Sequence, residues 1–245
     1  MASRLLLRQI SLLRYLSSAA AMFGDQSKAP VDRALRGIDP AALRLQARFA
    51  CNKRLERIAA VFPRTLEILA NDRTLILREF VEAIPPTSKS TLANAREFHA
   101  FLMLRWEYEA PRPLYLPDVA SCELAMTEVR NVVKDHERVT KDVSKRAGNC
   151  IKRRRSVVVL SCAFDVRPIF DSGSSNIVAP KRKTSIAVTL TAGSREVRLV
   201  KVPTNAGDAL MLLDDWTHAR VLDAFGERDY LLRLLAAQEL IEMQT

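Results

Sequence analysis

Histidine is the first residue type to consider, because it can bind a metal or transfer a proton near neutral pH. The chain has three histidines, His99, His136 and His218. None lies at the spacing of a zinc or iron motif from a second ligand, apart from single pairs such as Asp214 four residues before His218. A single pair does not make a metal site. We therefore expect no metal ligand, no cofactor and no catalytic residue on this chain.

Nucleophilic chemistry has no sequence signature either. Neither a GxSxG elbow nor a glycine-rich phosphate loop occurs, and the chain has only 7 glycines. The 4 cysteines are far apart and match neither a disulfide framework nor a CxxC pair. We expect them to be free thiols in a reducing compartment, the cytoplasm. Autonomous enzyme activity is not expected.

The stretch CAFDVRPIF at 162–170 places charged residues directly after an apolar run. Asp165 and Arg167 share a face of an extended segment, and Pro168 disfavours helical geometry at the residue before it. We expect a strand end whose charges belong either to an interface or to a local ion pair. A Trp and a His further along are also of the types that mark contacts. The candidate partner-interface residues are Asp165, Arg167, Pro168, Trp216 and His218.

Period-two alternation predicts a β-hairpin from Thr184 to Val202, turning at Ala192-Gly-Ser194. A strand at a sheet edge offers unpaired N–H and C=O groups, to which an extended peptide can add as a further strand. Basic residues at 195, 198 and 201 would favour an acidic peptide. The alternative is an edge covered by the protein itself or by a partner. The candidate peptide-binding residues are Val197, Arg198, Leu199, Val200, Lys201 and Val202.

From about Asp39 to Val133, apolar residues recur at spacings of three and four, which predicts a helical bundle with short loops. The segment from Lys134 to Arg155 lacks this periodicity and predicts a solvated helix extension followed by a linker. Helix starts are expected at Asp39-Pro40, at Asn94 with Glu97 as its capping-box partner, and at Asp118.

Ser156–Phe164 is β-branched and apolar, and predicts a strand before the hairpin. After Pro203 the chain reads as three short helices. Three strands and three helices are the content of a winged-helix-like domain, although here the strands come first. We predict an α+β fold: a weakly ordered or extra segment at 1–24, a helical bundle at 25–150, and a winged-helix-like domain with a three-stranded antiparallel sheet at 151–245.

The net charge of +10 is concentrated in two segments. Residues 1–24 contain three Arg and no acid, giving +3, and residues 134–155 contain nine Lys or Arg against three acids, giving +6. The basic runs at 152–155 and 180–183 raise the alternative of a DNA-binding regulator. The C-terminal helices offer few side chains suited to base edges, so we favour an acidic protein partner over nucleic acid.

The N-terminal residues 1–22 are rich in Arg, Ser and Leu, as in a mitochondrial transit peptide. An ordinary N-terminal helix, or a true start at Met22, accounts for this composition equally simply, and we favour those accounts. No apolar run approaches the roughly 20 residues needed to span a bilayer, so no membrane partner is expected.

Two stretches resemble a known family. RLERIAAVFPRTLEILANDRTLILREFVEAIPPTSKSTLANAREFHAFL, followed by YLPDVASCELA, resembles proteins labelled DNA-binding that accompany TIM-barrel multinuclear iron proteins. The strand ending in FDVRPIFD is similar to the corresponding part of the MbnC-like subunits of methanobactin biosynthesis. Together the two stretches lie within a resemblance that covers roughly residues 43–245.

The resemblance implies a heterodimer with the TIM-barrel iron protein MbnB. That complex uses dioxygen to convert cysteines of the precursor peptide MbnA to oxazolone and thioamide groups. In this family the iron belongs to the barrel subunit, and the MbnC-like subunit docks the barrel and binds the leader peptide. The resemblance carries over only Asp165, Arg167 and Pro168 as matching positions.

Overall fold

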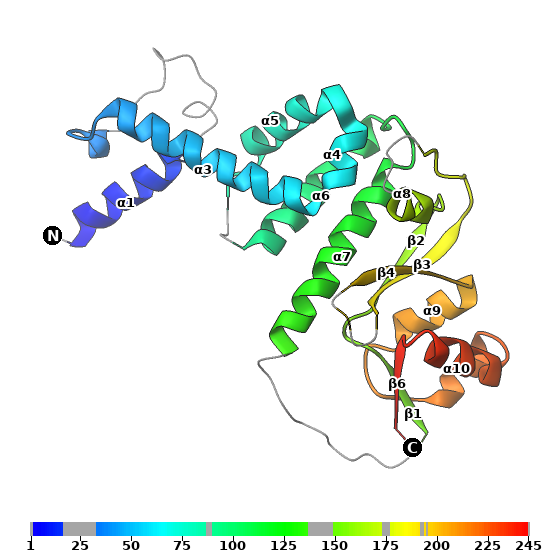
Figure 1. Ribbon diagram of the computed structural model, residues 1–245. Helices are drawn as coiled ribbons and strands as arrows, with labels where there is room; N and C mark the ends of the chain where they lie inside the picture. The colour runs from blue at the N-terminus through cyan, green and yellow to red at the C-terminus, as the bar shows by residue number, and fades with distance from the viewer. Residues whose placement is uncertain are drawn as a thin grey trace. The chain divides into compact units, whose positions relative to one another are not determined.

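The computed structural model describes residues 2–16, 33–86, 90–136, 149–172, 177–191, 194 and 196–244, with the backbone alone at 2–4 and 133–136. The chain divides into two compact units, residues 1–108 and 109–245 (Figure 1). The α+β class is confirmed: a helical N-terminal region precedes a small three-stranded antiparallel sheet.

The described part of the first unit is helical. Its elements are α1 (Ala2–Leu16), η1 (Arg33–Leu35), α3 (Pro40–Val61), α4 (Pro63–Leu69), η2 (Ala70–Asp72), α5 (Arg73–Ala83) and α6 (Thr91–Tyr108). Helix α3 begins as predicted: the Asp39 side chain accepts a hydrogen bond from the backbone N–H of Ala41, and Pro40 occupies the first turn.

Helix α6 begins at Thr91, four residues before the start that an N-cap at Asn94 implies, so Asn94 is not its N-cap. The backbone N–H of Asn94 donates to the C=O of Ser90, and the Ser90 hydroxyl accepts from the N–H of Ala93 at 3.4 Å. Asn94 is instead 2 % exposed inside the helix. Its side chain has a long-range partner, which a local capping rule does not consider.

That partner is Arg54, which lies buried in α3. Its guanidinium donates from Nε to Asn94 Oδ1 at 2.9 Å, from one terminal nitrogen to the C=O of Ile84 at 2.6 Å, and from the other to Glu97 Oε2 at 3.1 Å. It also lies over the ring of Phe80, 4.4 Å from the centroid. One cation thus joins α3, the C-terminal end of α5, and α6.

The core of this unit is aromatic. The Phe98 ring meets Phe62 and Phe80 edge-on, with centroids 5.3 and 5.1 Å apart. Pairs of this geometry stabilise more than their buried area alone provides. Since Phe80 also receives the Arg54 guanidinium, the polar network and the aromatic core share a side chain.

The second unit contains both sheets. Its elements are α7 (Leu116–His136), β1 (Cys150–Arg153), β2 (Val158–Cys162), α8 (Arg167–Asp171), β3 (Thr184–Leu190), β4 (Val197–Val202), α9 (Thr204–Leu212), β5 (Thr217–His218), η3 (Ala219–Ala224), α10 (Arg228–Ala237) and β6 (Ile241–Gln244). The antiparallel sheet β2-β3-β4 is the predicted one.

A second antiparallel sheet, β5-β1-β6, was not predicted. Cys150–Arg153 lies in the segment expected to be a linker, yet it pairs with Ile241–Gln244 and with the two-residue strand β5. In place of the second of the three helices expected after Pro203, the chain forms the strand β5 and the short 3-10 helix η3. Distant partners, rather than local periodicity, create these strands. Of the expected linker, residues 137–148 lie outside the described part of the chain.

Helix α7 belongs with the sheet, because it packs on β2, β3 and β4. The boundary between the two compact units accordingly falls between residues 108 and 109, whereas the sequence predicted a domain boundary at 150. The predicted stripe of α7 is buried at Val119, Cys122 and Val129, while Met126 is half-buried. A helix that shares its apolar face with a sheet joins that sheet's unit, whatever the composition of the segment that follows it.

Strand β3 is the centre of this unit, and six of its seven residues are buried. Residues of α9 and α10, including Leu210, Leu213 and Leu235, form a hydrophobic cluster with Ala187 and Val202 of the sheet. Helix α9 comes close to the sheet at Gly207, where a Cβ atom would lie 2.9 Å from Ser185 Cβ. A residue without a side chain is therefore needed at this crossing.

Among the described residues, no helix combines the length and apolar character needed to cross a membrane.

Replacing Arg54 by Ala is expected to lower the free energy of unfolding by about 3 kcal/mol, because Glu97 and Asn94 lose a buried partner. Chemical denaturation followed by circular dichroism measures this change. Arg78→Ala is the matched control, since Arg78 forms an exposed pair with Glu82 on one helix and its loss is expected to cost at most about 0.5 kcal/mol. Equal effects of the two changes would contradict the assigned role of Arg54.

Candidate functional site

Strand β4 is an edge strand of the sheet β2-β3-β4. Its register is regular, from Ser185 paired with Val202 to Leu190 paired with Val197. Within the described part of the chain, β3 is its only strand neighbour. The outer backbone groups of β4 therefore have no partner strand there, which is the geometry that strand addition requires.

The direction of each backbone group along β4 follows from one hydrogen bond. The N–H of Thr191 donates to the C=O of Glu196 at 2.9 Å, which continues the hairpin register. In an antiparallel ladder, hydrogen-bonded and non-hydrogen-bonded pairs alternate. Every second residue from Glu196 thus points its N–H and C=O at β3: Arg198, Val200 and Val202. The residues between them point these groups outward: Val197, Leu199 and Lys201.

The side chains of β4 alternate between the two faces of the sheet in step with its backbone groups. Val202 is 2 % exposed in the cluster formed with α9 and α10, and Val200 packs against it. The opposite face of the sheet lies toward α7, as shown by the hydrogen bond between the thiols of Cys162 on β2 and Cys122 on α7. Val197, Leu199 and Lys201 are on this face. Their outward backbone groups and their side chains therefore border the same surface.

Lys201 is exposed, whereas Val197 and Leu199 are half-buried. A peptide strand added to β4 would meet two apolar side chains and one cation at alternate positions. This pattern suits an extended segment with apolar residues and an acidic one.

Arg198, expected to attract an acidic peptide, is engaged within the protein. One of its terminal nitrogens donates to the C=O of Gln238 at 2.7 Å, and its guanidinium lies 3.8 Å from the Glu239 carboxylate. It therefore links β4 to the turn between α10 and β6. Arg195, the third basic residue of the expected set, lies outside the described residues.

Asp165 and Arg167 form a two-point ion pair. Arg167 Nε donates to Asp165 Oδ1 at 2.8 Å, and its terminal nitrogen donates to Oδ2 at 2.6 Å. The hydrogen bond from Arg167 is the main cause that lowers the pKa of the Asp165 carboxyl, and the same bond raises the pKa of Arg167. Asp165 and Arg167 thus form a local ion pair, which was one of the two alternatives expected from the sequence.

The extended geometry expected at Arg167 was wrong, since Arg167 opens the short helix α8. Pro168 lies in the first turn of this helix, where a missing N–H costs no hydrogen bond. The steric preference against a helical residue before proline was outweighed by this placement.

The start of α7 holds the segment that carries this pair. Asp118 Oδ2 accepts from the N–H of Phe164 at 2.8 Å, and its carboxylate also accepts from the N–H of Ala163. The Tyr115 ring contacts Phe164 edge-on, with centroids 6.2 Å apart. Asp118 was expected to open α7, but the helix begins at Leu116 and the carboxylate serves this long-range contact. Burial is the main cause that raises the pKa of Asp118.

Trp216 and His218 lie at β5 of the sheet β5-β1-β6, whereas the Asp165–Arg167 pair follows β2 of the other sheet, so the expected interface residues fall into two groups. His218 on β5 faces Cys150 on β1 as its direct partner, and its Nδ1 accepts from the N–H of Arg220 at 3.2 Å. Trp216, half-buried, precedes β5. The structure thus places His218 at a helix start, a role that the sequence analysis did not assign to it.

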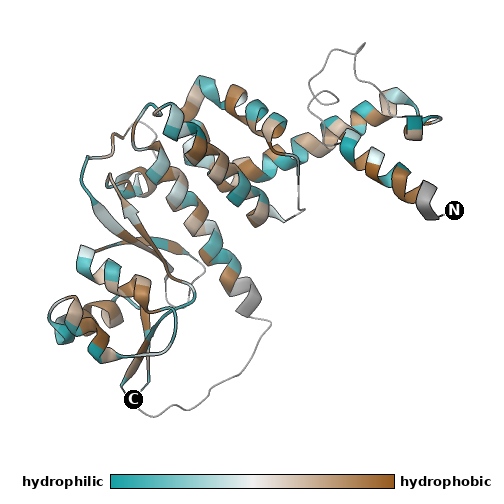
Figure 2. Ribbon diagram, turned by 180° about the vertical axis from the view of Figure 1, so that it is seen from behind, coloured by the Kyte–Doolittle hydropathy of each residue, from teal (hydrophilic) through white to brown (hydrophobic). Residues whose placement is uncertain are grey.

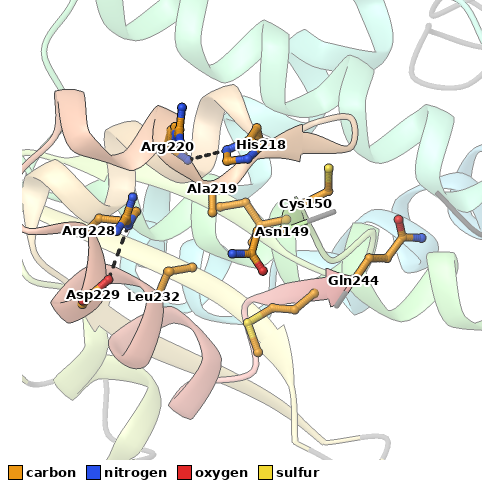
Figure 3. A pocket seen from close by; sticks show the side chains of 11 residues that line it. Asn149, Cys150, His218, Ala219, Arg220, Arg228, Asp229, Leu232 and Gln244 are labelled. Carbon is orange, nitrogen blue, oxygen red and sulfur yellow. Dashed lines mark hydrogen bonds and ion pairs between the residues drawn. The ribbon is translucent and has the colours of Figure 1, made fainter. Parts of the chain in front are cut away.

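A cavity of about 410 Å³ lies beside β5, β1 and β6 (Figure 3). Figure 3 shows Asn149, Ala219 and Leu232 around it, with His218 and Arg220 on one side and Arg228 with Asp229 on another. The sequence analysis missed this cavity because it depends on the unpredicted strands. No local pattern joins residues 149, 218, 228 and 244.

The basic run at 152–155 is partly neutralised. Lys152 Nζ lies 3.5 Å from Asp215 Oδ1, and Arg153 pairs with Asp214. Lys181, Arg182 and Lys183, by contrast, are exposed ahead of β3. Two of the four basic residues at 152–155 are therefore paired with acidic residues of the same unit.

In the described part of the chain, no three His, Cys, Asp or Glu side chains are grouped as a metal site would require. The four cysteines are free thiols, as expected. The chain matches no protein-family model and no curated protein at a significant level.

Asp165→Asn is expected to destabilise the protein at pH 7 and to have a progressively smaller effect below about pH 4, the ordinary pKa of an unfolded Asp. The folded-state pKa of Asp165 is depressed, so its contribution is complete above the unfolded pKa and is lost as the pH falls through the folded one. Denaturation curves of both proteins between pH 3 and pH 7, a range chosen roughly to bracket that titration, measure the difference. A difference that stays constant over this range would show that the carboxylate charge is not responsible.

Proposed function

We propose that this chain is a non-catalytic, peptide-binding subunit of an iron-dependent peptide-modifying oxygenase. The observation that carries the proposal is the edge of β4, with outward backbone groups at Val197, Leu199 and Lys201. An extended leader segment of a precursor peptide adds to this edge. Backbone hydrogen bonds supply affinity, and the alternate side chains supply specificity.

The oxygenase part of the proposal rests on the resemblance to MbnC-like subunits. In that reading, a TIM-barrel partner of the MbnB type holds the iron and oxidises cysteines of an MbnA-type peptide to oxazolone and thioamide groups. This chain contributes binding and placement: it holds the leader so that the cysteines reach the partner's iron. Its own residues perform no bond-making step.

Two surfaces are available for the barrel partner. One carries Asp165, Arg167 and Pro168, and the other carries Trp216 and His218 beside the cavity. The Asp165 carboxylate is already satisfied by Arg167, so the first surface offers a partner mainly what remains of the guanidinium. The second offers a half-buried indole, and aromatic side chains often anchor interfaces.

The alternative function is a DNA-binding regulator, which the exposed run Lys181–Lys183 favours. The pairing of Lys152 and Arg153 with acids argues against the other basic run as a phosphate site. DNA binding through phosphate contacts would also give the open edge of β4 no function. We therefore rank this function second.

Lys201→Pro is the sharpest test of strand addition. The Lys201 N–H points outward, so proline removes a hydrogen bond to the added peptide and none within the sheet. Binding of the leader of an MbnA-type peptide, measured by fluorescence anisotropy, is expected to weaken about tenfold or more. Lys201→Ala, which removes the same charge but keeps the N–H, is the matched control and is expected to bind considerably better.

Val200→Pro supplies the opposite control, because its N–H points at β3. This change is expected to lower the stability of the folded protein, whereas Lys201→Pro is expected to leave thermal unfolding nearly unchanged. If Lys201→Pro bound the leader as tightly as Lys201→Ala, addition at this edge would be excluded.

Co-expression with an MbnB-type barrel protein tests the partner reading separately. A stoichiometric complex that contains iron, with none on this chain alone, is expected from size exclusion and metal analysis. A chain that stays alone and shifts duplex DNA in a salt-dependent way, weakened by Lys181→Ala, Arg182→Ala and Lys183→Ala together, would favour the regulator instead.

A further inference from the structure

Helix α1 carries an apolar stripe that the first unit does not bury. Leu6, Ile10 and Leu13 are 58, 37 and 67 % exposed. They follow one another at spacings of four and three residues, so they lie along one side of the helix. Figure 2 shows hydrophobic residues along α1 among hydrophilic ones. An exposed stripe of large aliphatic side chains indicates a surface that binds something.

The stripe is separate from the face of α1 that packs within the unit. Helix α1 contacts α3 and η1, and its buried residue is Tyr15, with Leu12 and Leu16 half-buried next to it. At about 100° per residue, Tyr15 and Leu12 lie on the far side of the helix from Leu6, Ile10 and Leu13, and Leu16 lies between the two sets at the end of the helix. Helix α1 can therefore stay docked on α3 while its stripe contacts another surface.

The sequence from α1 into α3 is strongly positive. Residues 1–53 contain nine Lys or Arg against three Asp, a net charge of +6. Within α1 itself there are three Arg and no acid. Arg8, Arg36 and Arg48 are exposed. Each cation near an anionic lipid surface adds about 1 kcal/mol of attraction at moderate ionic strength.

We propose that α1 adsorbs on an anionic lipid bilayer, with Leu6, Ile10 and Leu13 inserted at the boundary between headgroups and acyl chains. In this helix of 15 residues, Arg8 lies on the other side from the stripe and Arg14, four residues after Ile10, lies at the edge of the stripe, which suits an in-plane position among anionic headgroups. Charge complementarity favours a negative surface. The apolar stripe favours lipid over nucleic acid, because phosphates offer nothing for three aliphatic side chains to bury against.

This inference is independent of the proposed function, since it concerns the first unit and the peptide edge lies in the second. The sequence-based expectation of no membrane partner was based on the absence of a segment long enough to span a bilayer. The present proposal concerns a helix that lies on the bilayer surface, which that argument does not address.

Sedimentation with large unilamellar vesicles tests the proposal on the full chain. Binding is expected to phosphatidylcholine vesicles that contain phosphatidylglycerol, to be much weaker without phosphatidylglycerol, and to fall as salt is raised. Replacing Leu6, Ile10 and Leu13 together by Gln is expected to reduce the partition coefficient about tenfold or more. Circular dichroism and thermal unfolding establish whether this variant keeps the fold.

The matched control is an apolar stripe on α3. Leu45 and Phe49 are 67 and 64 % exposed and lie opposite the buried Leu43 and Ala47. Leu45→Gln with Phe49→Gln is expected to leave vesicle binding nearly unchanged. A second measurement uses Leu6→Trp, whose fluorescence is expected to be quenched by brominated acyl chains.

Three results would overturn the proposal: no sedimentation of the unmodified chain with anionic vesicles, equal binding to vesicles without phosphatidylglycerol, or unchanged binding of the α1 variant. Absence of quenching at Trp in position 6 would overturn it even if the triple variant failed to fold. In the first case an acidic protein would be the next occupant to consider for the stripe.

Discussion

The burial of strand β3 on both faces is the constraint on which the second unit depends. Helix α7 covers one face and the cluster of α9 and α10 covers the other, so six of the seven residues of β3 are buried. A strand buried in this way must lie between two others, which leaves β2 and β4 as the edges. The direction of each group on β4 then follows from its pairing with β3. The proposed peptide site is thus a consequence of packing on a different strand.

The first unit is organised by a buried cation rather than by a sheet. Arg54 joins three helices through hydrogen bonds to one amide, one carboxylate and one carbonyl. The aromatic ring beneath it belongs to the core. A charge in this position is tolerated because each of its three guanidinium nitrogens donates to an acceptor. Local patterns do not reveal such a residue, because an Arg in a helix usually lies at the surface.

Strong local periodicity made the larger elements predictable. Alternation at 184–202 gave the correct hairpin, and Asp39-Pro40 gave the correct start of α3. Strands β1 and β6 were missed because CIKR and IEMQ are short and rich in polar residues. They become strands by pairing with each other, and β1 also pairs with β5. The assignment of Asn94 and Asp118 as helix caps was wrong for a similar reason. Their side chains bind groups that are distant in the sequence, which a local capping rule does not consider. Of the candidate site, the strand was predictable, whereas its edge position and the engagement of Arg198 required the tertiary pairing.

The shared parity of backbone and side chain on β4 has a consequence for how such a site changes during evolution. Val197, Leu199 and Lys201 point their backbone groups away from β3 and lie outside the cluster formed with α9 and α10, whereas Val202 belongs to that cluster and Val200 packs against it. In the proposed peptide site, substitutions that change ligand preference are expected at these odd-numbered positions, whereas substitutions at the even-numbered ones would also change the packing of the sheet. The peptide preference of such a site would then change through three side chains without loss of the packing against α9 and α10. In the proposed site, recognition and folding thus fall on two interleaved sets of positions within one strand.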